Sequence, residues 1–217
     1  MSDRSVFGGS LASPPCFAHE LAETADGFAV TDPQTATDVA RWRKAERERL
    51  LAARKAMSRS DRDAATRSIA ARLDSRIEFR PGLAVSVYWP IRGEPDLRDW
   101  MRSLVKREIT VLLPVITEKG TPIRFFSWTP EGRMVPGFWN IPVPENGEER
   151  QPDVSIVPLV GFDADRYRLG YGGGYFDRTL ASLKQRPETF GIGYRSSEVP
   201  TIFPQPHDIA MTHIVTA

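Results

Sequence analysis

The sequence has little of what marks secreted, membrane-spanning or nucleic-acid-binding proteins. One cysteine, Cys16, stands among 217 residues, so no disulfide can form within the chain and we expect a reducing, cytoplasmic environment. No apolar run approaches the length that spans a bilayer. The chain has 29 Lys and Arg against 28 Asp and Glu, and this balance argues against a dedicated nucleic-acid or membrane surface.

The composition predicts one domain with an appendage. A chain of this length can bury one core, and 18 prolines with 16 glycines make it rich in loops. Residues 1–36 show no hydrophobic period, so we expect an extension that is partly disordered or draped over a domain formed by residues 37–217. Cys16 and His19 of the extension could bind a metal together with further ligands, or could belong to a docked tail.

Short apolar runs alternate with helical patterns along the domain. The runs are rich in β-branched residues and predict buried strands, and the segments between them carry apolar residues at helical spacing. The predicted strands lie at residues 84–89, 109–116, 123–128, 154–160 and 189–194. This order predicts an α/β fold with an open, mostly parallel sheet and helices on both faces, a three-layer α/β/α architecture whose ligands collect at the carboxyl ends of the strands.

The stretch from Arg168 to Asp177 joins the strand at 154–160 to a helix through a glycine-rich loop. Four glycines in the five residues 170–174 let backbone N–H groups approach a ligand, and the helix start behind them favours an anion. Arg168 offers a planar cation suited to phosphate, and Asp177 offers an oxygen suited to Mg²⁺. A plain turn is the alternative for the glycines, and an acid that complements the helix dipole is the alternative for Asp177.

These ten residues resemble the signature of the 5-formyltetrahydrofolate cyclo-ligase (methenyltetrahydrofolate synthetase) family, approximately R-[LIF]-G-x-G-x-G-[YF]-[YF]-D. The lead-in at residues 158–163 and the tail at 206–216 are similar to the family as well, so the resemblance covers roughly residues 40–217. It implies Mg²⁺- and ATP-dependent cyclisation of 5-formyltetrahydrofolate to 5,10-methenyltetrahydrofolate, with ADP and phosphate released. The expected partners are reduced folate and ATP, not nucleic acid or membrane, and we expect a monomer.

The resemblance also implies which residues form the site. It assigns catalysis to Arg168 and Asp177. It assigns ATP binding to Arg43, Arg47, Arg168, Gly170, Gly172, Gly173, Gly174, Tyr175 and Phe176. It assigns the folate substrate to Trp89, Glu94, Trp139, Tyr171 and Tyr175, and Mg²⁺ to Asp177 and Asp208.

Several of these positions have alternatives. The basic residues of the helix predicted at 37–57 could form a solvated face, Glu94 could be an exposed turn residue, and Trp139 could fill a core. The chain also departs from the family pattern: Arg43 stands in place of a lysine and Glu46 in place of a leucine, while Ser197 and Thr212 replace a glutamine and an acid. A paralogue acting on another small molecule, or a non-catalytic nucleotide- or folate-binding module, is therefore the alternative function.

Overall fold

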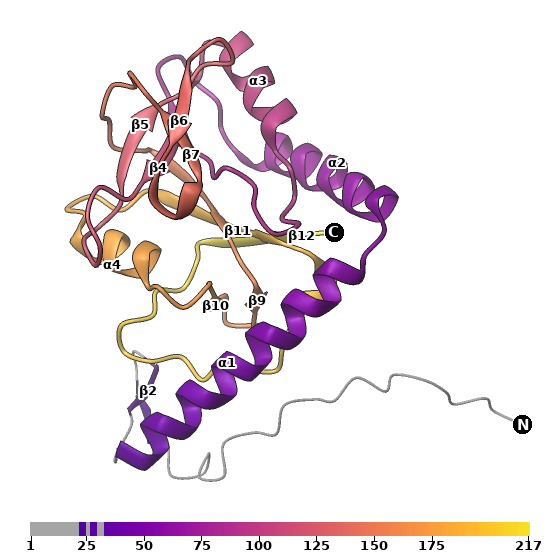
Figure 1. The fold of residues 1–217 in the computed structure, drawn as a ribbon, viewed down its shortest axis with the longest axis vertical. Coiled ribbons are helices and arrows are strands. Elements are labelled where there is room, and N and C mark those ends of the chain that lie inside the picture. The colour runs from indigo at the N-terminus through magenta and orange to yellow at the C-terminus, as the bar shows by residue number, and fades with distance from the viewer. Residues whose placement is uncertain (1–21, 25–26, 30–32) are drawn as a thin grey trace, which may run out of the picture.

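The computed structural model describes residues 22–24, 27–29 and 33–217 (Figure 1). Cys16, His19 and most of the predicted extension lie outside these residues, so the expectations about them are untested. Helix α1 (Pro33–Ala56) crosses the predicted boundary between residues 36 and 37. The division of the chain into an extension and a domain stays a prediction.

A six-stranded sheet forms the centre of the domain, in the order β12-β11-β8-β3-β4-β5. All neighbours are parallel except β4 and β5, which pair antiparallel at one edge. The strands are β3 (Ala84–Ser86), β4 (Thr110–Val115), β5 (Arg124–Ser127), β8 (Val154–Pro158), β11 (Glu188–Gly193) and β12 (His213–Thr216). The predicted open, mostly parallel sheet is confirmed, although the strand predicted at 84–89 ends at Ser86.

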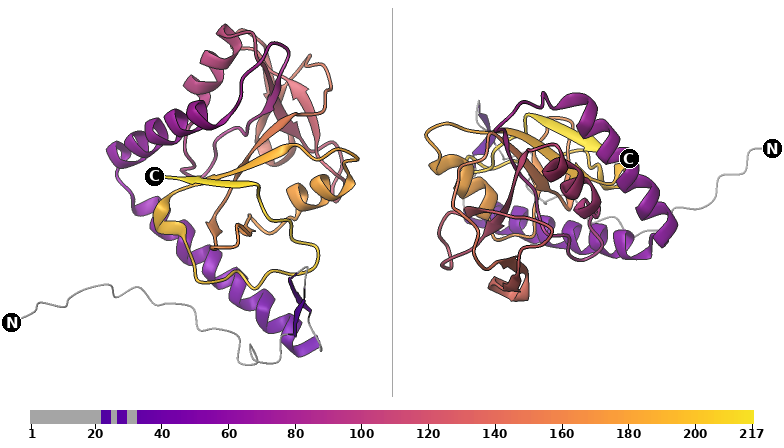
Figure 2. Two further views of the ribbon diagram at one scale, coloured as in Figure 1. Left: turned by 180° about the vertical axis from the view of Figure 1, so that it is seen from behind. Right: turned by 90° about the horizontal axis from the view of Figure 1, so that it is seen from above.

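Helices cover both faces of this sheet (Figures 1 and 2). On one face, Val85, Val111 and Ile156 belong to the large core cluster under α2 (Arg59–Arg76) and α3 (Arg98–Lys106). Ala84 and Leu112 are next in sequence to Val85 and Val111. They point to the other face, where they lie near the start of α4 (Tyr175–Ser182). Successive strand residues point to opposite faces, so these short apolar runs build both halves of the three-layer core.

The second helix begins and packs as its sequence predicts. The Ser58 hydroxyl caps α2 by accepting a hydrogen bond from the Asp61 amide at 3.1 Å, which satisfies a backbone donor that the helix itself leaves free. Ile69 and Leu73, one turn apart, are both fully buried. This pair holds α2 on the sheet.

Helix α1 is different because it lies beside the carboxyl ends of the strands rather than over a face (Figure 1). Its Leu50 packs with Val160, Leu169 and Ile202, which all come after β8 in the chain. Leu50 shares its buried stripe with charged residues, chiefly Arg43, Glu46 and Arg54. The helix therefore presents buried cations to the end of the sheet where ligands bind in open α/β folds.

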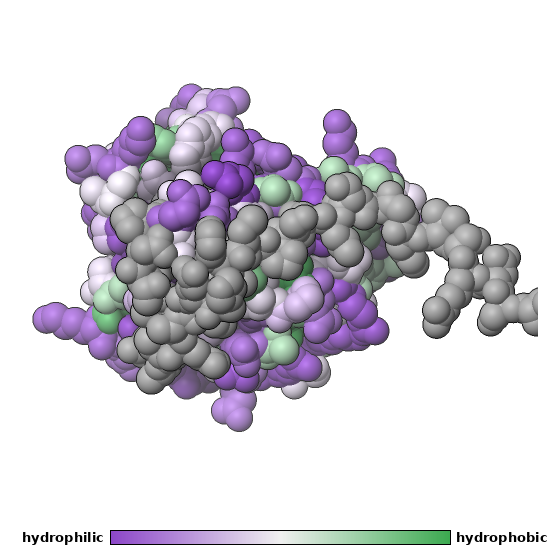
Figure 3. Space-filling model, turned by 90° about the horizontal axis from the view of Figure 1, so that it is seen from below, coloured by the Kyte–Doolittle hydropathy of each residue, from purple (hydrophilic) through white to green (hydrophobic). Residues whose placement is uncertain are grey.

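Short strand pairs and turns complete the fold. They are β1 (Ala22–Thr24) with β2 (Gly27–Ala29), β6 (Met134–Pro136) with β7 (Pro142–Pro144), and β9 (Gly161–Phe162) with β10 (Arg168–Leu169), together with 3₁₀ turns at Phe138–Asn140 and Arg195–Ser197. Within the described part of the chain, no helix combines the length and apolarity needed to cross a membrane. On the face seen in Figure 3, the residues coloured by hydropathy are mostly hydrophilic.

Candidate active site

The glycine-rich loop runs from the end of β10 at Leu169 to the start of α4 at Tyr175. Gly172 and Gly174 have φ angles of +97° and +63°, which other residues rarely adopt. A Cβ on Gly173 would lie 2.7 Å from the Tyr175 ring. Gly172, Gly173 and Gly174 therefore suit this conformation, which brings the loop backbone to the amino end of a helix.

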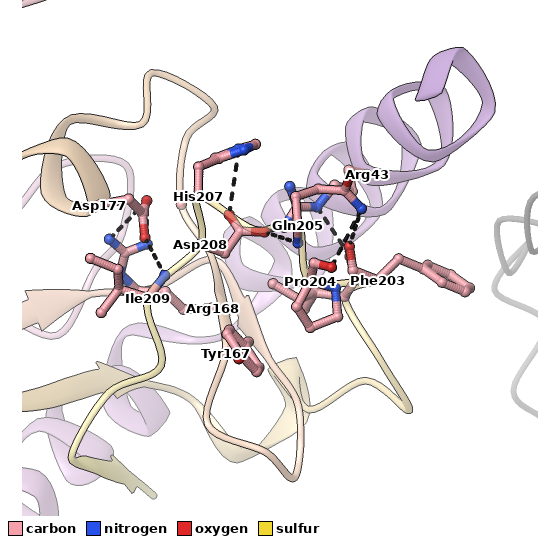
Figure 4. A network of polar contacts seen from close by, with 12 residues as sticks. Arg43, Tyr167, Arg168, Asp177, Phe203, Pro204, Gln205, His207, Asp208 and Ile209 are labelled. Carbon is pink, nitrogen blue, oxygen red and sulfur yellow. Dashed lines mark hydrogen bonds and ion pairs between the residues drawn. The ribbon is translucent and has the colours of Figure 1, made fainter. Parts of the chain in front are cut away.

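Arg168 and Asp177 face each other across the loop. Both terminal nitrogens of Arg168 lie 3.2 Å from Asp177 Oδ2, and Asp177 Oδ1 accepts a hydrogen bond from the Ile209 amide at 3.2 Å (Figure 4). The arginine side chain is 4% exposed and the carboxylate side chain 12%. Among the described residues Arg168 Nε has no hydrogen-bond partner although it is buried. A buried guanidinium with an unused donor is suited to a further anionic oxygen.

Two arginines of α1 reach the same place. Arg43 donates to the carbonyl of Ile202 at 3.0 Å and to Asp208 at 2.5 Å (Figure 4). Arg47 donates to the carbonyl of Gly170 at 2.8 Å, which fixes the glycine loop to the helix. Burial and the neighbouring Arg43 lower the pKa of Arg47, while Asp208 raises it. A guanidinium crowded by another cation gains from a second negative charge.

A cavity of about 80 Å³ opens between these groups. Its lining consists of Arg43, Arg47, Arg168, Gly170, Gly172, Gly174, Asp177, His207 and Asp208. The predicted ATP-binding residues of α1, Arg168 and three of the four loop glycines thus lie around one cavity, whereas Gly173, Tyr175 and Phe176 do not line it. Three guanidiniums against two carboxylates leave an excess of positive charge, so the cavity is suited to a polyanion.

The carboxylates of this cavity fit a particular kind of Mg²⁺ site. Within the described residues, no group of three or more His, Cys, Asp or Glu side chains could enclose a metal ion. Asp177 and Asp208 line one cavity, and each is already paired with an arginine. Mg²⁺ commonly takes one or two protein carboxylates and completes its shell with water and substrate phosphates. The residues fit a Mg²⁺ that arrives with a nucleotide, and they do not fit a site made by protein alone.

A larger hollow of about 330 Å³ lies near the opposite ends of the strands, lined in part by Arg76, Glu78, Asp153 and Glu188. None of the residues singled out from the sequence lines it. Open α/β sheets bind ligands at the carboxyl ends of their strands, so the smaller cavity is the better candidate.

Glu94 lies in the turn that follows β3, and it is buried rather than exposed. The residue is 6% exposed, which excludes the exposed-turn alternative. Its Oε2 accepts from the Ile91 amide at 2.8 Å, and its Oε1 accepts from the Tyr171 hydroxyl at 2.9 Å. Burial raises the pKa of Glu94 to about 7, although the donors Ile91 and Tyr171 and the cations Arg54 and Arg92 oppose that rise. Burial also raises the pKa of Tyr171.

The aromatic residues assigned to the substrate lie in different environments. Trp139 is 64% exposed, so it does not fill a core, and its ring meets Tyr175 edge-on at 5.6 Å. Tyr175 belongs to α4 and packs partly against the cluster under that helix, as Phe176 does. Trp89 instead packs against the core cluster of the α2 and α3 face, with Arg98 over its ring. Trp139 and Tyr175 therefore flank the glycine loop, whereas Trp89 lies against the other face of the sheet.

The departures from the family pattern are accommodated by local partners. Glu46 is buried on α1 and is paired with Arg49. The hydroxyl of Ser197 donates to the carbonyl of Tyr194. The hydroxyl of Thr212 accepts from the amide of Thr189, at the beginning of β11 and so at the end of the sheet remote from the loop.

Sequence reasoning missed Arg54. This residue is 3% exposed and donates to the carbonyl of Leu159 and, at 3.2 Å, to the Tyr171 hydroxyl. A signal was present in the sequence, because Arg43, Arg47, Leu50 and Arg54 recur at i, i+4, i+7 and i+11 and so form one stripe of a helix. A leucine within a stripe of arginines indicates that the cations are buried with it.

The fold and the cavity define an α/β protein with a glycine-rich anion-binding loop at the carboxyl ends of a mostly parallel sheet. Comparison with known proteins identifies it further. Residues 39–217 match the model of the 5-formyltetrahydrofolate cyclo-ligase family, and the chain belongs to that family.

Individual relatives agree with this assignment. The 5-formyltetrahydrofolate cyclo-ligase of Mycolicibacterium smegmatis is 30% identical over 148 residues, which are 62% of this chain and 74% of the relative. That of Mycoplasma pneumoniae is 27% identical over 175 residues, 80% of this chain and 97% of the relative. The solution structure of the 5,10-methenyltetrahydrofolate synthetase of Aquifex aeolicus superposes with a TM-score of 0.70 at 29% identity, covering 80% of this chain and 89% of that one.

Proposed function

We propose that this protein cyclises 5-formyltetrahydrofolate to 5,10-methenyltetrahydrofolate with ATP and Mg²⁺, releasing ADP and phosphate. Family membership supports the reaction. The observation that carries the nucleotide part is the small cavity where Arg43, Arg47 and Arg168 meet the glycine loop. Its residues supply what phosphoryl transfer needs most, which is positioning and neutralisation of charge.

The chemistry requires ATP because the formyl group on nitrogen 5 is an amide, and an amide oxygen is a poor leaving group. In the proposed course, that oxygen attacks the γ-phosphorus and ADP leaves, which gives an imidate phosphate. Nitrogen 10 then attacks the same carbon and loses its proton, and phosphate departs as the ring closes. No side chain needs to act as a nucleophile. Arg43, Arg47 and Arg168 bind and orient the phosphates, and the loop amides donate to them.

Asp177 and Asp208 are the proposed ligands of Mg²⁺, which when bound with ATP neutralises phosphate charge. Both carboxylates line the phosphate cavity, and both are held by backbone amides as well as by arginines. As the guanidiniums turn to the phosphates, the carboxylates become free to accept other partners. Asp177 and Asp208 thus keep Arg168 and Arg43 in place before the nucleotide arrives.

The folate end is proposed to involve Glu94, Tyr171, Trp139 and Tyr175. A pterin presents several N–H donors, and a buried carboxylate such as Glu94 is a matched acceptor. Trp139 and Tyr175 offer aromatic faces beside the glycine loop. Trp89 remains a prediction as a wall of this site. The monomeric state and the cytoplasmic location likewise remain predictions.

The test is the absorbance of methenyltetrahydrofolate after protein, Mg-ATP and 5-formyltetrahydrofolate are mixed. We expect the signal to require all three, and to fall sharply in Arg168→Met, which keeps the side-chain stem and removes the charge. The exposed Arg41→Met is the matched control, since its side chain is 70% exposed. Binding of both ligands without product would instead support the non-catalytic module, and ATP hydrolysis without folate binding would support a paralogue.

A further inference from the structure

The Tyr171 hydroxyl joins two elements that are far apart in the sequence. It donates to Glu94 Oε1 at 2.9 Å and accepts from Arg54 Nη1 at 3.2 Å. Arg54 comes from α1, Tyr171 from the glycine loop, and Glu94 from the turn after β3. A single phenol therefore links a buried cation to a buried carboxylate.

Arg54 is fixed well enough to orient that phenol. Its other terminal nitrogen donates to the carbonyl of Leu159, just past the end of β8, and its guanidinium lies 5.8 Å from the ring centre of Tyr194. An arginine cannot accept a hydrogen bond. When Arg54 donates to the phenol oxygen, the phenol proton must point elsewhere, and Glu94 is the acceptor within reach.

We propose that Arg54 is a positioning residue for folate recognition: it aligns the Tyr171 hydroxyl so that this donor faces Glu94 and keeps that carboxylate an acceptor for ring N–H groups. The inference rests on the proposed function and deepens it, because it names a residue that acts on the substrate only through Tyr171. Glu94 uses two acceptor positions for Ile91 and Tyr171, and a carboxylate has about four. Two positions remain for a ligand.

The ionisation of Glu94 makes this role measurable. Burial raises its pKa to about 7, and Tyr171, Arg54 and Arg92 each act against that rise. Tyr171 comes from the glycine loop, Arg54 from α1, and Arg92 from the same turn as Glu94. Two further phenols, Tyr88 and Tyr194, lie beside the same turn and donate to the carbonyls of Pro95 and Gly93. Arg62 of α2 lies against Gly93.

The sign of the expected pH effect follows directly. Ring N–H groups bind the ionised carboxylate, so folate affinity should be full above the pKa of Glu94 and should fall as the pH drops through about 7. The Tyr171 hydroxyl and the Arg54 charge both lower the pKa of Glu94, so removing either one should raise that pKa. The midpoint of the affinity curve should then move to higher pH, with affinity recovered in alkaline solution.

A purely structural role for Arg54 makes a different prediction. Its hydrogen bond to Leu159 could serve only to hold α1 on the end of β8. Loss of that bond would lower the unfolding temperature and weaken folate binding equally at every pH. The position of the midpoint separates the two roles.

The experiment measures the dissociation constant of 5-formyltetrahydrofolate by calorimetry, without ATP, across about two pH units on either side of neutrality. Tyr171→Phe, which keeps the ring and the bond between Arg54 and Leu159, should move the midpoint upward by roughly one pH unit. Arg54→Met should move it at least as far. Tyr194→Phe is the matched control: it also loses a phenol hydroxyl bound to the same turn, yet it should leave the midpoint unchanged.

Three results would overturn the inference: an unmoved midpoint in Tyr171→Phe, an equal movement in Tyr194→Phe, or a midpoint that persists in Glu94→Gln. If Arg54→Met does not fold, Arg54→Lys replaces it. Lysine retains a charge but not the fixed fork, so a smaller upward movement supports the role and no movement contradicts it. Absence of folate binding in the wild-type protein at every pH would contradict the proposed function, whereas binding with an unmoved midpoint contradicts this inference alone.

Discussion

The two ends of the candidate site differ in how their arginines and carboxylates are paired. At the phosphate end, guanidiniums meet carboxylates directly, as Arg168 meets Asp177 and Arg43 meets Asp208. At the folate end a neutral hydroxyl stands between the ions, because Tyr171 separates Arg54 from Glu94. Arg54 and Glu94 are buried as Arg168 and Asp177 are, whereas Tyr171 between them is 36% exposed, so the two ends differ in the group that the arginine contacts.

This difference corresponds to the ligands that each end would receive. In the proposed reaction a polyanion replaces Asp177 and Asp208 at the arginines, so the ion pairs would hold the cations in place until the nucleotide binds. A neutral pterin needs an acceptor that is not already consumed by a cation. A phenol donor leaves part of the Glu94 carboxylate available, whereas a direct arginine fork would occupy it.

The largest effect is expected from Asp177→Asn at the phosphate end. The amide keeps an acceptor for the Ile209 amide but turns a donor toward Arg168, which leaves a buried guanidinium without its counter-ion. Breaking a buried pair in this way costs about 3 kcal/mol of stability. We also expect turnover to fall by about 100-fold or more, because a proposed carboxylate ligand of Mg²⁺ in the phosphate cavity is lost.

Thermal unfolding and turnover well below the unfolding temperature measure the two effects separately. Asp177 is 8% exposed, so its substitution should lower stability as well as turnover. Asp99→Asn is the control, since Asp99 forms an exposed ion pair with Arg102 whose loss should cost less than about 1 kcal/mol. Full activity in Asp177→Asn would remove this carboxylate from the site.

The next largest effect is expected from Glu94→Gln at the folate end. Glutamine retains the shape but loses the charge, so folate affinity should fall by roughly 10- to 100-fold, the value of one or two charge-assisted hydrogen bonds. Affinity for a non-hydrolysable ATP analogue should change little, because Glu94 does not line the phosphate cavity. Calorimetry with each ligand checks both statements. Glu188→Gln, beside His213 and far from the loop, is the matched control, and equal folate affinity in both variants would contradict the assignment of Glu94.

A smaller effect is expected from Arg43→Lys, which restores the residue type of the family pattern. Arg43 donates from separate nitrogens to Ile202 and Asp208, and a lysine cannot reproduce this fork. We expect affinity for the ATP analogue to fall by about 10-fold, with folate affinity unaffected. Arg41→Lys, at an exposed position of the same helix, should change neither value. Unaltered or tighter nucleotide binding in Arg43→Lys would show that the fork does not serve the phosphates.

The sequence predicted those parts of the site that lie close together in the chain. The glycines, Arg168 and Asp177 occupy one ten-residue stretch between a strand and a helix, so their chemistry and their setting could be inferred together. The fold class followed in the same way, because period and apolar runs are local properties. The ends of the elements were predicted less well, because β3 ends at Ser86 and the predicted strand ran to residue 89.

The partners across the chain could not be predicted in this way. Arg43 and Asp208 are 165 residues apart, Arg54 and Tyr171 are 117 apart, and Tyr171 and Glu94 are 77 apart. Charged helices are usually solvated on most sides, so only the stripe that includes Leu50 indicated buried arginines. The family resemblance supplied Glu94 and Trp139, but it could not supply their burial, which is what decides between the alternatives for each.

The smallest effect is expected from Trp139→Leu, and it tests whether the folate end extends beyond Glu94. Trp139 is 64% exposed and meets Tyr175 and Phe138 by ring edges, so its loss should change the stability of the fold by less than about 0.5 kcal/mol. If its ring forms an aromatic wall for the substrate, folate affinity should fall by roughly 3- to 10-fold, in line with the value of one aromatic contact. Calorimetry and thermal unfolding measure both quantities. Trp139→Phe, which keeps a ring, should restore most of the affinity. Equal affinity in Trp139→Leu and the wild-type protein would confine folate recognition to the buried residues around Glu94.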